Sequence, residues 1–578
     1  MMRLRRTESS AVHWTGEGPR GMQLGHALRV AECRRFHGGN AFTQKRTGWT
    51  VETPREACGV KRTVALFALL VALSLAYRFP AIVNAGTVDS DAAIVGLQAR
   101  HLLAGEWSWF LYGSGYQTSV DSCVAALFFA VLGSTSLALL LSTLIGHVAA
   151  TCLAFGTLVR HLPRPSAFVA VLPLVFTSSP LHTYILNPPR QAALTLVFLA
   201  VFVIDGASGR RREDARRLQG ALGAAIGSLA CFADPYALLV LPPLLVLALL
   251  ACFDGATLRA SGRVVLGRIA AGAVGAAVGL IPLALLLSSP RSVHGEVTLT
   301  SSVVRHNLAL LVDPCLPWLL GATAYTPVAL LGYVPWEPGV VLHALQRLGA
   351  AAFLVAIVSG VALAPSRARV DWALARLGAF GFLVAVLTIA SFLVSVMVMD
   401  LFSSRYLAAL VLMSPFALAP LAGRLGWKRL LLILAPYLTS AGVCGWVGYG
   451  DEVRGAHVVE LPAEGAGDER ALLGMLEDRG IHAAIADYWV SYRLTFLSRE
   501  AVVVVPIHER EDRYPAYRTT YAGATRAAYI FDPKRSREQL SVMEAEAFSG
   551  PSPSRWGSPV ERLHSGSLTA VVFDKPAL

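Results

Sequence analysis

Residues 377–399 read LGAFGFLVAVLTIASFLVSVMVM, a run without a charged side chain that is bordered by Arg376 and Asp400. An α-helix needs about 20 consecutive apolar residues to cross the roughly 30 Å hydrocarbon core of a bilayer. The run therefore predicts a membrane-spanning helix. Ten further segments have the same character, which predicts about eleven spans: 63–85, 135–158, 166–186, 191–207, 218–233, 236–252, 267–288, 340–363, 377–399, 406–423 and 429–449.

The composition of the whole chain agrees with a polytopic α-helical membrane protein. Of its 578 residues 54% are hydrophobic and 15% are charged, and the mean hydropathy is +0.54. A soluble domain usually has about a quarter charged residues. These values exclude an ordinary cytosolic enzyme, a disordered chain and a nucleic-acid-binding module. The 8 cysteines include no Cys-x-x-Cys pair, so we expect neither a disulfide framework nor a structural metal.

Basic residues are concentrated in alternate loops, which predicts the orientation of the chain. Loops on the cytoplasmic side of a membrane carry an excess of Lys and Arg. The basic N-terminal segment, 1–62, belongs to the Lys/Arg-rich set, so we expect it to be cytoplasmic. An odd number of spans then puts 450–578 outside the membrane. The rich set contains Arg160, Arg164, Arg210, Arg211, Arg212, Arg216, Arg217, Arg259, Arg263, Arg268, Arg367, Arg369, Arg376, Arg424, Lys428 and Arg429.

Three domains follow from this reading. Residues 1–62 are rich in Arg, Gly and Thr without hydrophobic periodicity and are expected to be disordered. Alternatively, translation begins at Met22 or later. Residues 63–449 form the multi-span membrane domain. Residues 450–578 are expected to form a soluble α/β domain, because stretches typical of strands (481–486, 501–505, 527–531, 568–573) alternate with helical stretches (468–479, 488–497, 537–548).

The first external loop, 86–134, has a defined local structure. Asp89 or Ser90 is a suitable N-cap for a helix that ends at Gly105. A second apolar helix, 120–132, is too short to span and is expected to lie along the membrane surface. Between the two helices stand aromatic residues typical of a membrane–water interface, namely Trp107, Trp109, Phe110, Tyr112 and Tyr116.

This loop resembles a known family. The stretches DSDAAIVGLQARHLLAGE (89–106) and YGSGYQTSVD (112–121), with Arg405-Tyr406 opening a late span, resemble the C-superfamily (GT-C) glycosyltransferases. The likeness is to the branch of protein O-mannosyltransferases and bacterial aminoarabinose transferases. It covers the first loop closely and the layout of 63–449 loosely. It implies a multi-pass protein of a bacterial-type cytoplasmic (inner) membrane.

The resemblance also implies an activity. Such enzymes invert the sugar that they transfer from a polyprenyl-phosphate donor to an acceptor hydroxyl on the external face, without a cofactor. The acceptor is left open between protein, lipid and glycan. Asp91 takes the position of the family's catalytic Asp, and Ala92 stands where Glu is usual. Asp89 is a candidate for the second carboxylate. The alternative is that both aspartates only cap the helix, worth about 0.3–2 kcal/mol.

A cation must hold the leaving phosphate, and Arg is the natural choice. The sparse, external set of arginines consists of Arg405, Arg190, Arg291 and Arg305. Arg405 is the first candidate because it begins a span, at the level where a lipid phosphate lies. The alternative is that Arg405-Tyr406 is an interfacial anchor pair. Asp234-Pro235-Tyr236 is expected to be a tight turn.

Two other classes of function compete with the transferase. A secondary transporter places ionisable groups at mid-membrane in repeated halves, whereas the notable acids here lie in a loop and no internal repeat is evident. A non-catalytic envelope scaffold remains open because of Ala92.

Overall fold

A computed structural model describes most of the chain and divides it into two compact units, Met1–Val60 and Lys61–Leu578. In the first unit only residues 54–60 are described, as the start of helix α1. Statements below about absent features concern the described residues, which are 54–83, 85, 88–178, 181, 185, 190–209, 212–253, 262–288, 300–322, 339–367, 371–450, 463–531, 558–566 and 568–574.

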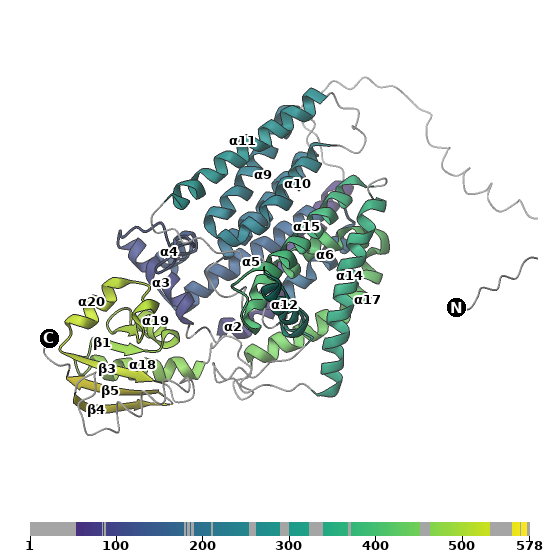
Figure 1. Ribbon diagram of the computed structural model, residues 1–578. Coiled ribbons are helices and arrows are strands. Elements are labelled where there is room, and N and C mark those ends of the chain that lie inside the picture. The colour runs from purple at the N-terminus through teal and green to yellow at the C-terminus, as the bar shows by residue number, and fades with distance from the viewer. Residues whose placement is uncertain are drawn as a thin grey trace, which may run out of the picture. The chain divides into compact units, whose positions relative to one another are not determined.

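Every predicted span coincides with helix in the described residues (Figure 1). Six helical segments are long and apolar enough to cross a membrane. They are α1 (Pro54–Tyr77), α5 (Ser136–Leu158), α11 (Gly262–Leu287), α14 (Val340–Arg367), α15 (Trp372–Val394) and the run formed by η3 (Leu401–Leu407), α16 (Ala408–Leu412) and α17 (Ser414–Gly450).

Shorter helices complete the membrane domain. Four are apolar but have only 10–17 residues: α4 (Val120–Leu132), α6 (Arg164–Val175), α8 (Gln191–Ala207) and α10 (Leu241–Cys252). The others are α2 (Phe79–Val83), α3 (Ser90–Leu103), α9 (Glu213–Ala233), η1 (Pro235–Leu239), α12 (Ser301–Leu310), η2 (Leu311–Cys315) and α13 (Leu316–Leu319). The helices of the predicted spans therefore lie where the sequence places them. By length and composition, six of the described helical segments could each cross a membrane.

The break between the last two predicted spans is a single residue. Gly426 has φ of +72° inside α17 and divides it into two helices. Glycine adopts this left-handed conformation at little steric cost.

Small residues allow close packing of α9 against α11. A Cβ placed on Gly275 would lie 2.0 Å from the carbonyl oxygen of Ala221, and one on Gly279 would lie 2.2 Å from that of Ala225. Glycines four apart bring helix backbones together in this way inside membranes.

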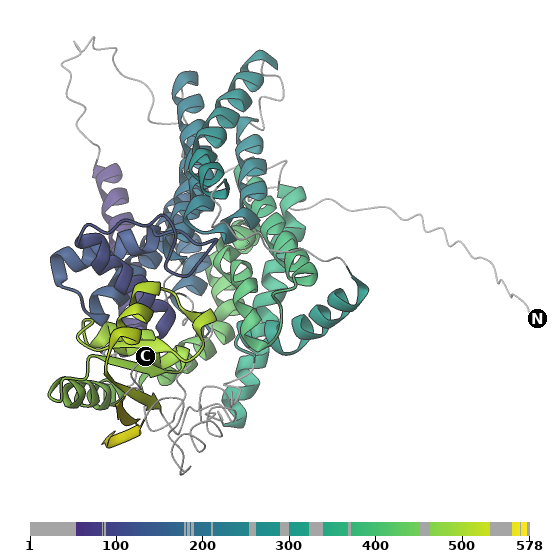
Figure 2. The same ribbon diagram turned by 60° about the vertical axis from the view of Figure 1, so that its left-hand side comes forward.

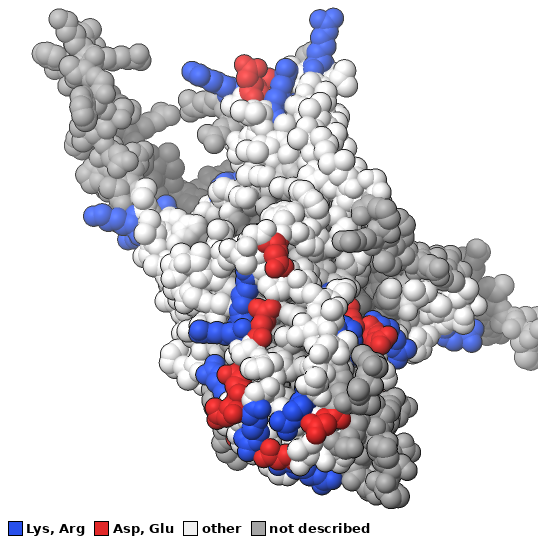
Figure 3. All heavy atoms as spheres, turned by 90° about the vertical axis from the view of Figure 1, so that its left-hand side faces the viewer, with Lys and Arg blue, Asp and Glu red and all other residues white. Residues whose placement is uncertain are grey.

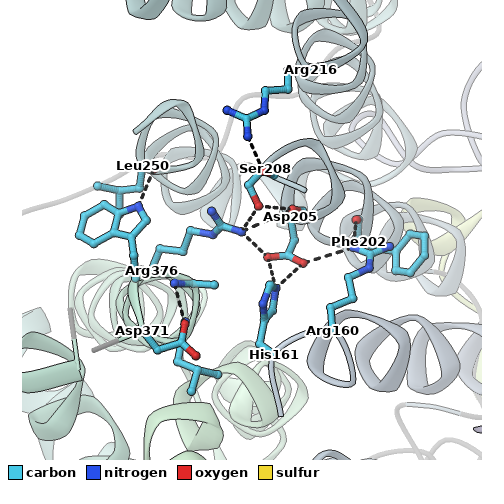
Figure 4. A network of polar contacts seen from close by, with 12 residues as sticks. Arg160, His161, Phe202, Asp205, Ser208, Arg216, Leu250, Asp371 and Arg376 are labelled. Carbon is cyan, nitrogen blue, oxygen red and sulfur yellow. Dashed lines mark hydrogen bonds and ion pairs between the residues drawn. The ribbon is translucent and has the colours of Figure 1, made fainter. Parts of the chain in front are cut away.

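The Lys/Arg-rich loops meet around one buried carboxylate, Asp205 (Figure 4). Arg376 donates to Asp205 at 2.7 Å, Arg160 donates at 3.2 Å, and the Nε2 of His161 lies 2.9 Å away. Arg216 donates to the carbonyl oxygen of Ser208, one turn further on. Loops that are distant in sequence but share the basic character are therefore joined at one end of α8.

The face of the molecule drawn in Figure 3 has charged side chains at the top and over the C-terminal domain at the bottom. A band below the top group is nearly bare of charge. This distribution is typical of a polytopic membrane protein with a polar domain attached to it.

The C-terminal domain is a layered α/β structure, as predicted. Its sheet has the order β2-β1-β3-β5-β4, with β1, β2 and β3 parallel and β5 antiparallel to both β3 and β4. The elements are α18 (Ala463–Glu477), β1 (Ala483–Ala486), α19 (Tyr488–Leu497), β2 (Val503–Pro506), η5 (Glu509–Glu511), α20 (Pro515–Gly523), β3 (Arg526–Phe531), β4 (Ser558–Ser565) and β5 (Leu568–Asp574). Sequence analysis did not identify α20 or β4, and the predicted helix 537–548 lies outside the described residues.

This domain shares a hydrophobic core with α3 and α4, the two helices of the loop 86–134. Buried residues of α3 and α4, among them Ile94 and Phe129, pack with Tyr492 and Phe496 of α19. Both views show the yellow-green domain against the purple-blue α3 and α4 (Figures 1 and 2). The interface places α19 beside the start of α3.

Candidate functional site

A cavity of about 260 Å³ lies where the loop 86–134, the starts of several membrane helices and the C-terminal domain meet. It collects residues from distant parts of the chain. Its lining consists of Asp91, Ile94, Leu111, Tyr112, Tyr116, Gln117, Leu181, Ile185, Arg190, Gln191, Leu194, Tyr236, Arg405, Tyr406, Ala408, Leu412 and Arg513.

The two candidate aspartates differ in position. Asp89 is the N-cap of α3, and its Oδ1 accepts a hydrogen bond of 2.7 Å from the backbone N–H of Ala92. This agrees with the predicted helix start. Asp91, the second residue of α3, is half-buried and lines the cavity. Ala92 is buried in the core shared with the C-terminal domain, so the position where the resemblance leads one to expect Glu is a packing position.

Asp91 is bonded to the C-terminal domain. The Tyr488 hydroxyl donates a hydrogen bond of 2.6 Å to its Oδ1, and the Nε of Arg513 donates to the Tyr488 oxygen at 3.2 Å. Burial, followed by the negative charge of Asp91, raises the pKa of Tyr488 well above its usual range. Burial alone would lower the pKa of Arg513, but Tyr488 and Asp91 nearby raise it. The tyrosine is therefore a neutral donor and the arginine a cation.

Arg190 is held in an unusual conformation at the start of α8. Its φ is +105°, which is rare for a residue with a side chain. The buried carboxylate of Asp121 accepts the backbone N–H groups of Arg190 and Ala192 at 2.9 and 3.0 Å. The Nε of Arg190 donates to Asp234 at 3.3 Å, and the Arg190 guanidinium lies 5.7 Å from the ring centre of Tyr236.

The Asp234-Pro235-Tyr236 turn does more than reverse the chain. Asp234 accepts from the backbone N–H of Tyr236 at 2.7 Å, as a turn residue does, and Gln117 also donates to it, at 3.3 Å. The Tyr236 hydroxyl in turn donates to the carbonyl oxygen of Tyr406 at 3.2 Å. The predicted turn is therefore correct, but it also connects Arg190 to the segment that carries Arg405.

Arg405 is exposed, and among the three arginines that line the cavity its side chain has the weakest contacts with the described protein groups. It donates to the hydroxyl of its neighbour Tyr406 at 3.2 Å, and no acidic side chain in the described part of the chain pairs with it. Arg305 lies exposed on α12 and does not line the cavity. Arg291 lies outside the described residues. The structure thus brings together Asp91, Arg190 and Arg405 from the predicted set.

The cavity has a cationic part and an apolar wall. Its charged lining residues are three arginines and one aspartate, so it favours an anion. Arginine is well suited to phosphate because its planar fork gives two parallel hydrogen bonds. The apolar part of the lining, called the apolar wall here, consists of Ile94, Leu111, Leu181, Ile185, Leu194 and Leu412. Such a lining fits an amphiphile with an anionic head.

A second polar cluster joins α3 to the C-terminal domain near the cavity. The Nε2 of His101 lies 2.7 Å from Oε1 of Glu500, and its Nδ1 lies 2.8 Å from the hydroxyl of Tyr112. Tyr517 donates to the same Glu500 oxygen at 2.5 Å. Burial alone would raise the pKa of Glu500, but the bonds from His101 and Tyr517 lower it. Among the described residues, no group of three or more His, Cys, Asp or Glu is placed to hold a metal ion.

Sequence reasoning missed Tyr488 and Arg513. The stretch 487–496 is rich in aromatic residues, but packing against the sheet explains most of it, since Tyr492 and Phe496 are in the core. Only docking of the domain shows that Tyr488 reaches a carboxylate in the first loop.

Comparisons with known proteins give a fold. No protein-family model and no curated protein sequence matches the chain. The crystal structure of apo ArnT from Cupriavidus metallidurans matches with a TM-score of 0.52 and 12% identity, over 90% of this chain and 98% of ArnT. The chain has the GT-C fold.

A second structure of ArnT from Cupriavidus metallidurans, bound to undecaprenyl phosphate, matches with a TM-score of 0.50 and 12% identity, over 89% of this chain and 98% of ArnT. The similarity extends into the C-terminal domain, because the unmatched tenth of this chain is shorter than that domain.

Proposed function

We propose that this chain is an inverting glycosyltransferase that moves a sugar from a polyprenyl-phosphate donor to an acceptor hydroxyl on the external face of the membrane. The observation that carries the proposal is the cavity that holds Asp91 and three arginines beside an apolar wall. The polyprenyl phosphate is proposed because the matching ArnT was solved with undecaprenyl phosphate and because the lining suits such an amphiphile.

The chemistry assigns a role to each group. The acceptor oxygen attacks C1 of the sugar from the face opposite the phosphate, and the C1–O bond to phosphate breaks. Asp91 takes the acceptor proton as general base. The phosphate leaves with the electron pair of the broken bond, as polyprenyl phosphate. Arg405 and Arg190 stabilise the negative charge that develops on it.

The test compares two aspartates on the same helix. Asp91→Asn removes the proton acceptor with little change in volume, so transfer should fall by about 10²–10⁴-fold. Asp89→Asn should keep most activity, because Asn is as good an N-cap as Asp. The measurement is release of polyprenyl phosphate by purified protein in liposomes, with a panel of polyprenyl-phosphate sugars and hydroxyl acceptors.

Each outcome separates the alternatives. Full activity of Asp91→Asn would show that the base is assigned wrongly. Equal loss in both variants would mean that Asp89 contributes the second carboxylate. A wild-type protein that binds undecaprenyl phosphate but releases none from any donor would favour a scaffold.

A further inference from the structure

We propose that Tyr488, with Arg513 behind it, positions the Asp91 carboxylate, so that the C-terminal domain completes the catalytic site. This inference rests on the proposed function. It goes beyond that function by assigning a task in catalysis to two residues that follow the last membrane helix.

The contacts of Tyr488 fix it to the start of α3 at two points. The hydroxyl of Ser90 donates to the backbone carbonyl oxygen of Tyr488 at 2.6 Å, and the Tyr488 hydroxyl donates to Asp91 at 2.6 Å. The backbone of α19 is fixed locally as well, because Asp487 caps this helix by accepting from the N–H of Trp489. The phenol therefore approaches Asp91 from a defined direction.

Arg513 fixes the direction of the tyrosine proton. Its Nε donates to the Tyr488 oxygen, so that oxygen is an acceptor toward Arg513 and its proton points to Asp91. Arg513 is itself held in place, since its backbone N–H donates to Tyr492 and its Nη1 donates to the carbonyl oxygen of Gly113 at 3.0 Å. Hydrogen bonds in such a chain strengthen one another.

The arrangement leaves one carboxylate oxygen for the reaction. Among the described residues, only Oδ1 of Asp91 accepts a hydrogen bond from the protein. The bond to Oδ1 stops rotation of the carboxylate and leaves Oδ2 to receive the acceptor proton.

The test uses two matched tyrosine variants. Tyr488→Phe removes the donor to Asp91, whereas Tyr517→Phe removes an equivalent donor to Glu500 at the same interface. Tyr488→Phe should lower kcat by about 10–100-fold with little change in KM for the donor. Tyr517→Phe should leave both kcat and this KM near their wild-type values, because neither Tyr517 nor Glu500 lines the cavity.

Further variants distinguish a positioning role from a structural one. If Tyr488 acts through Asp91, the double variant Asp91→Asn/Tyr488→Phe should be no slower than Asp91→Asn alone. If Tyr488→Phe does not fold, Arg513→Ala should show the same loss of kcat in weaker form, and its absence would overturn the proposal.

The failures of the two proposals are distinguishable. Wild-type kcat in Tyr488→Phe, with Asp91→Asn inactive, would overturn the positioning role alone. The same loss of kcat in Tyr517→Phe would also overturn it, because the effect would then belong to the interface as a whole. Full activity of Asp91→Asn would overturn the proposed function instead.

Discussion

The three arginines of the cavity differ in what already holds them. Arg190 is paired with Asp234 and clamped through its backbone by Asp121. Arg513 is bonded to Tyr488 and to the backbone of Gly113. Among the described residues, the side chain of Arg405 donates a hydrogen bond only to the hydroxyl of Tyr406. A ligand phosphate that binds Arg405 would therefore displace fewer protein contacts than one that binds Arg190 or Arg513.

Arg405→Ala should weaken binding of undecaprenyl phosphate by about 10-fold or more, since a hydrogen bond to a charged group is worth roughly 1.5–3 kcal/mol. Arg405→Lys should recover only part of the loss, because Lys keeps the charge but not the planar fork. The measurement is titration of the purified protein with undecaprenyl phosphate. Arg305→Ala is the control, because Arg305 lies outside the cavity. Unchanged affinity in Arg405→Ala would leave the residue as an interfacial anchor.

At the scale of elements, the contact of α3 with α19 decides where Asp91 and Tyr488 meet. Gly96 lies at this contact. A Cβ on Gly96 would lie 2.5 Å from Cε2 of Phe496 and 3.2 Å from Cδ2 of Leu139. Phe496 is buried in the shared core, so its ring has no free space into which it can move. The glycine lets the two helices approach closely enough for the tyrosine to reach the carboxylate.

Gly96→Ala should therefore destabilise the protein by about 1–3 kcal/mol through overpacking and should lower transfer as well, because α3 carries Asp91. Gly474→Ala is the matched control, since Gly474 is also helical but a Cβ there meets nothing within 4 Å. That change should stabilise α18 by about 0.5–1 kcal/mol. Thermal unfolding of the purified protein measures both. A Gly96→Ala protein as stable as Gly474→Ala would show that Phe496 and Leu139 can move away from an added methyl group at little cost.

At the scale of the whole molecule, α8 separates two chemically different ends. Asp205 in its last turn is the contact point of the Arg-rich loops, and Arg190, its N-cap residue, lines the cavity. A helix of 17 residues is about 25 Å long. From the excess of Lys and Arg we predict that the Asp205 end is cytoplasmic and that the cavity and the C-terminal domain are external.

A reporter that works only in the cytoplasm should accordingly stay silent when it is fused after Leu578. One that needs export should be active there. The control is a fusion in the basic loop after Ser208, which should give the reverse pattern. A cytoplasmic signal from the fusion after Leu578 would invert the topology and move the proposed reaction to the other face.

The features that were predicted correctly from the sequence are those that depend on local signals. Apolar runs located the helices, and Asp89 and Gly105 marked the ends of α3 within a residue or two. Loop charge could place arginines on one side of the membrane but could not separate Arg405, which lines the cavity, from Arg305, which does not. Tyr488 and Asp91 are nearly 400 positions apart, and only tertiary packing joins them. β4 was missed because its sequence, SPVERLHS, is polar, as is common for a strand at the edge of a sheet.

The placement of Tyr488 and Arg513 also bears on how the protein is made. Both residues follow α17 in the chain, so the ribosome synthesises them after every membrane helix. Asp91 is synthesised early, and its partner Tyr488 is translated about four hundred residues later. The nascent chain therefore holds an incomplete site throughout insertion. If Tyr488 positions Asp91 as proposed, a lipid-linked substrate meets a competent base only after the C-terminal domain has folded and docked.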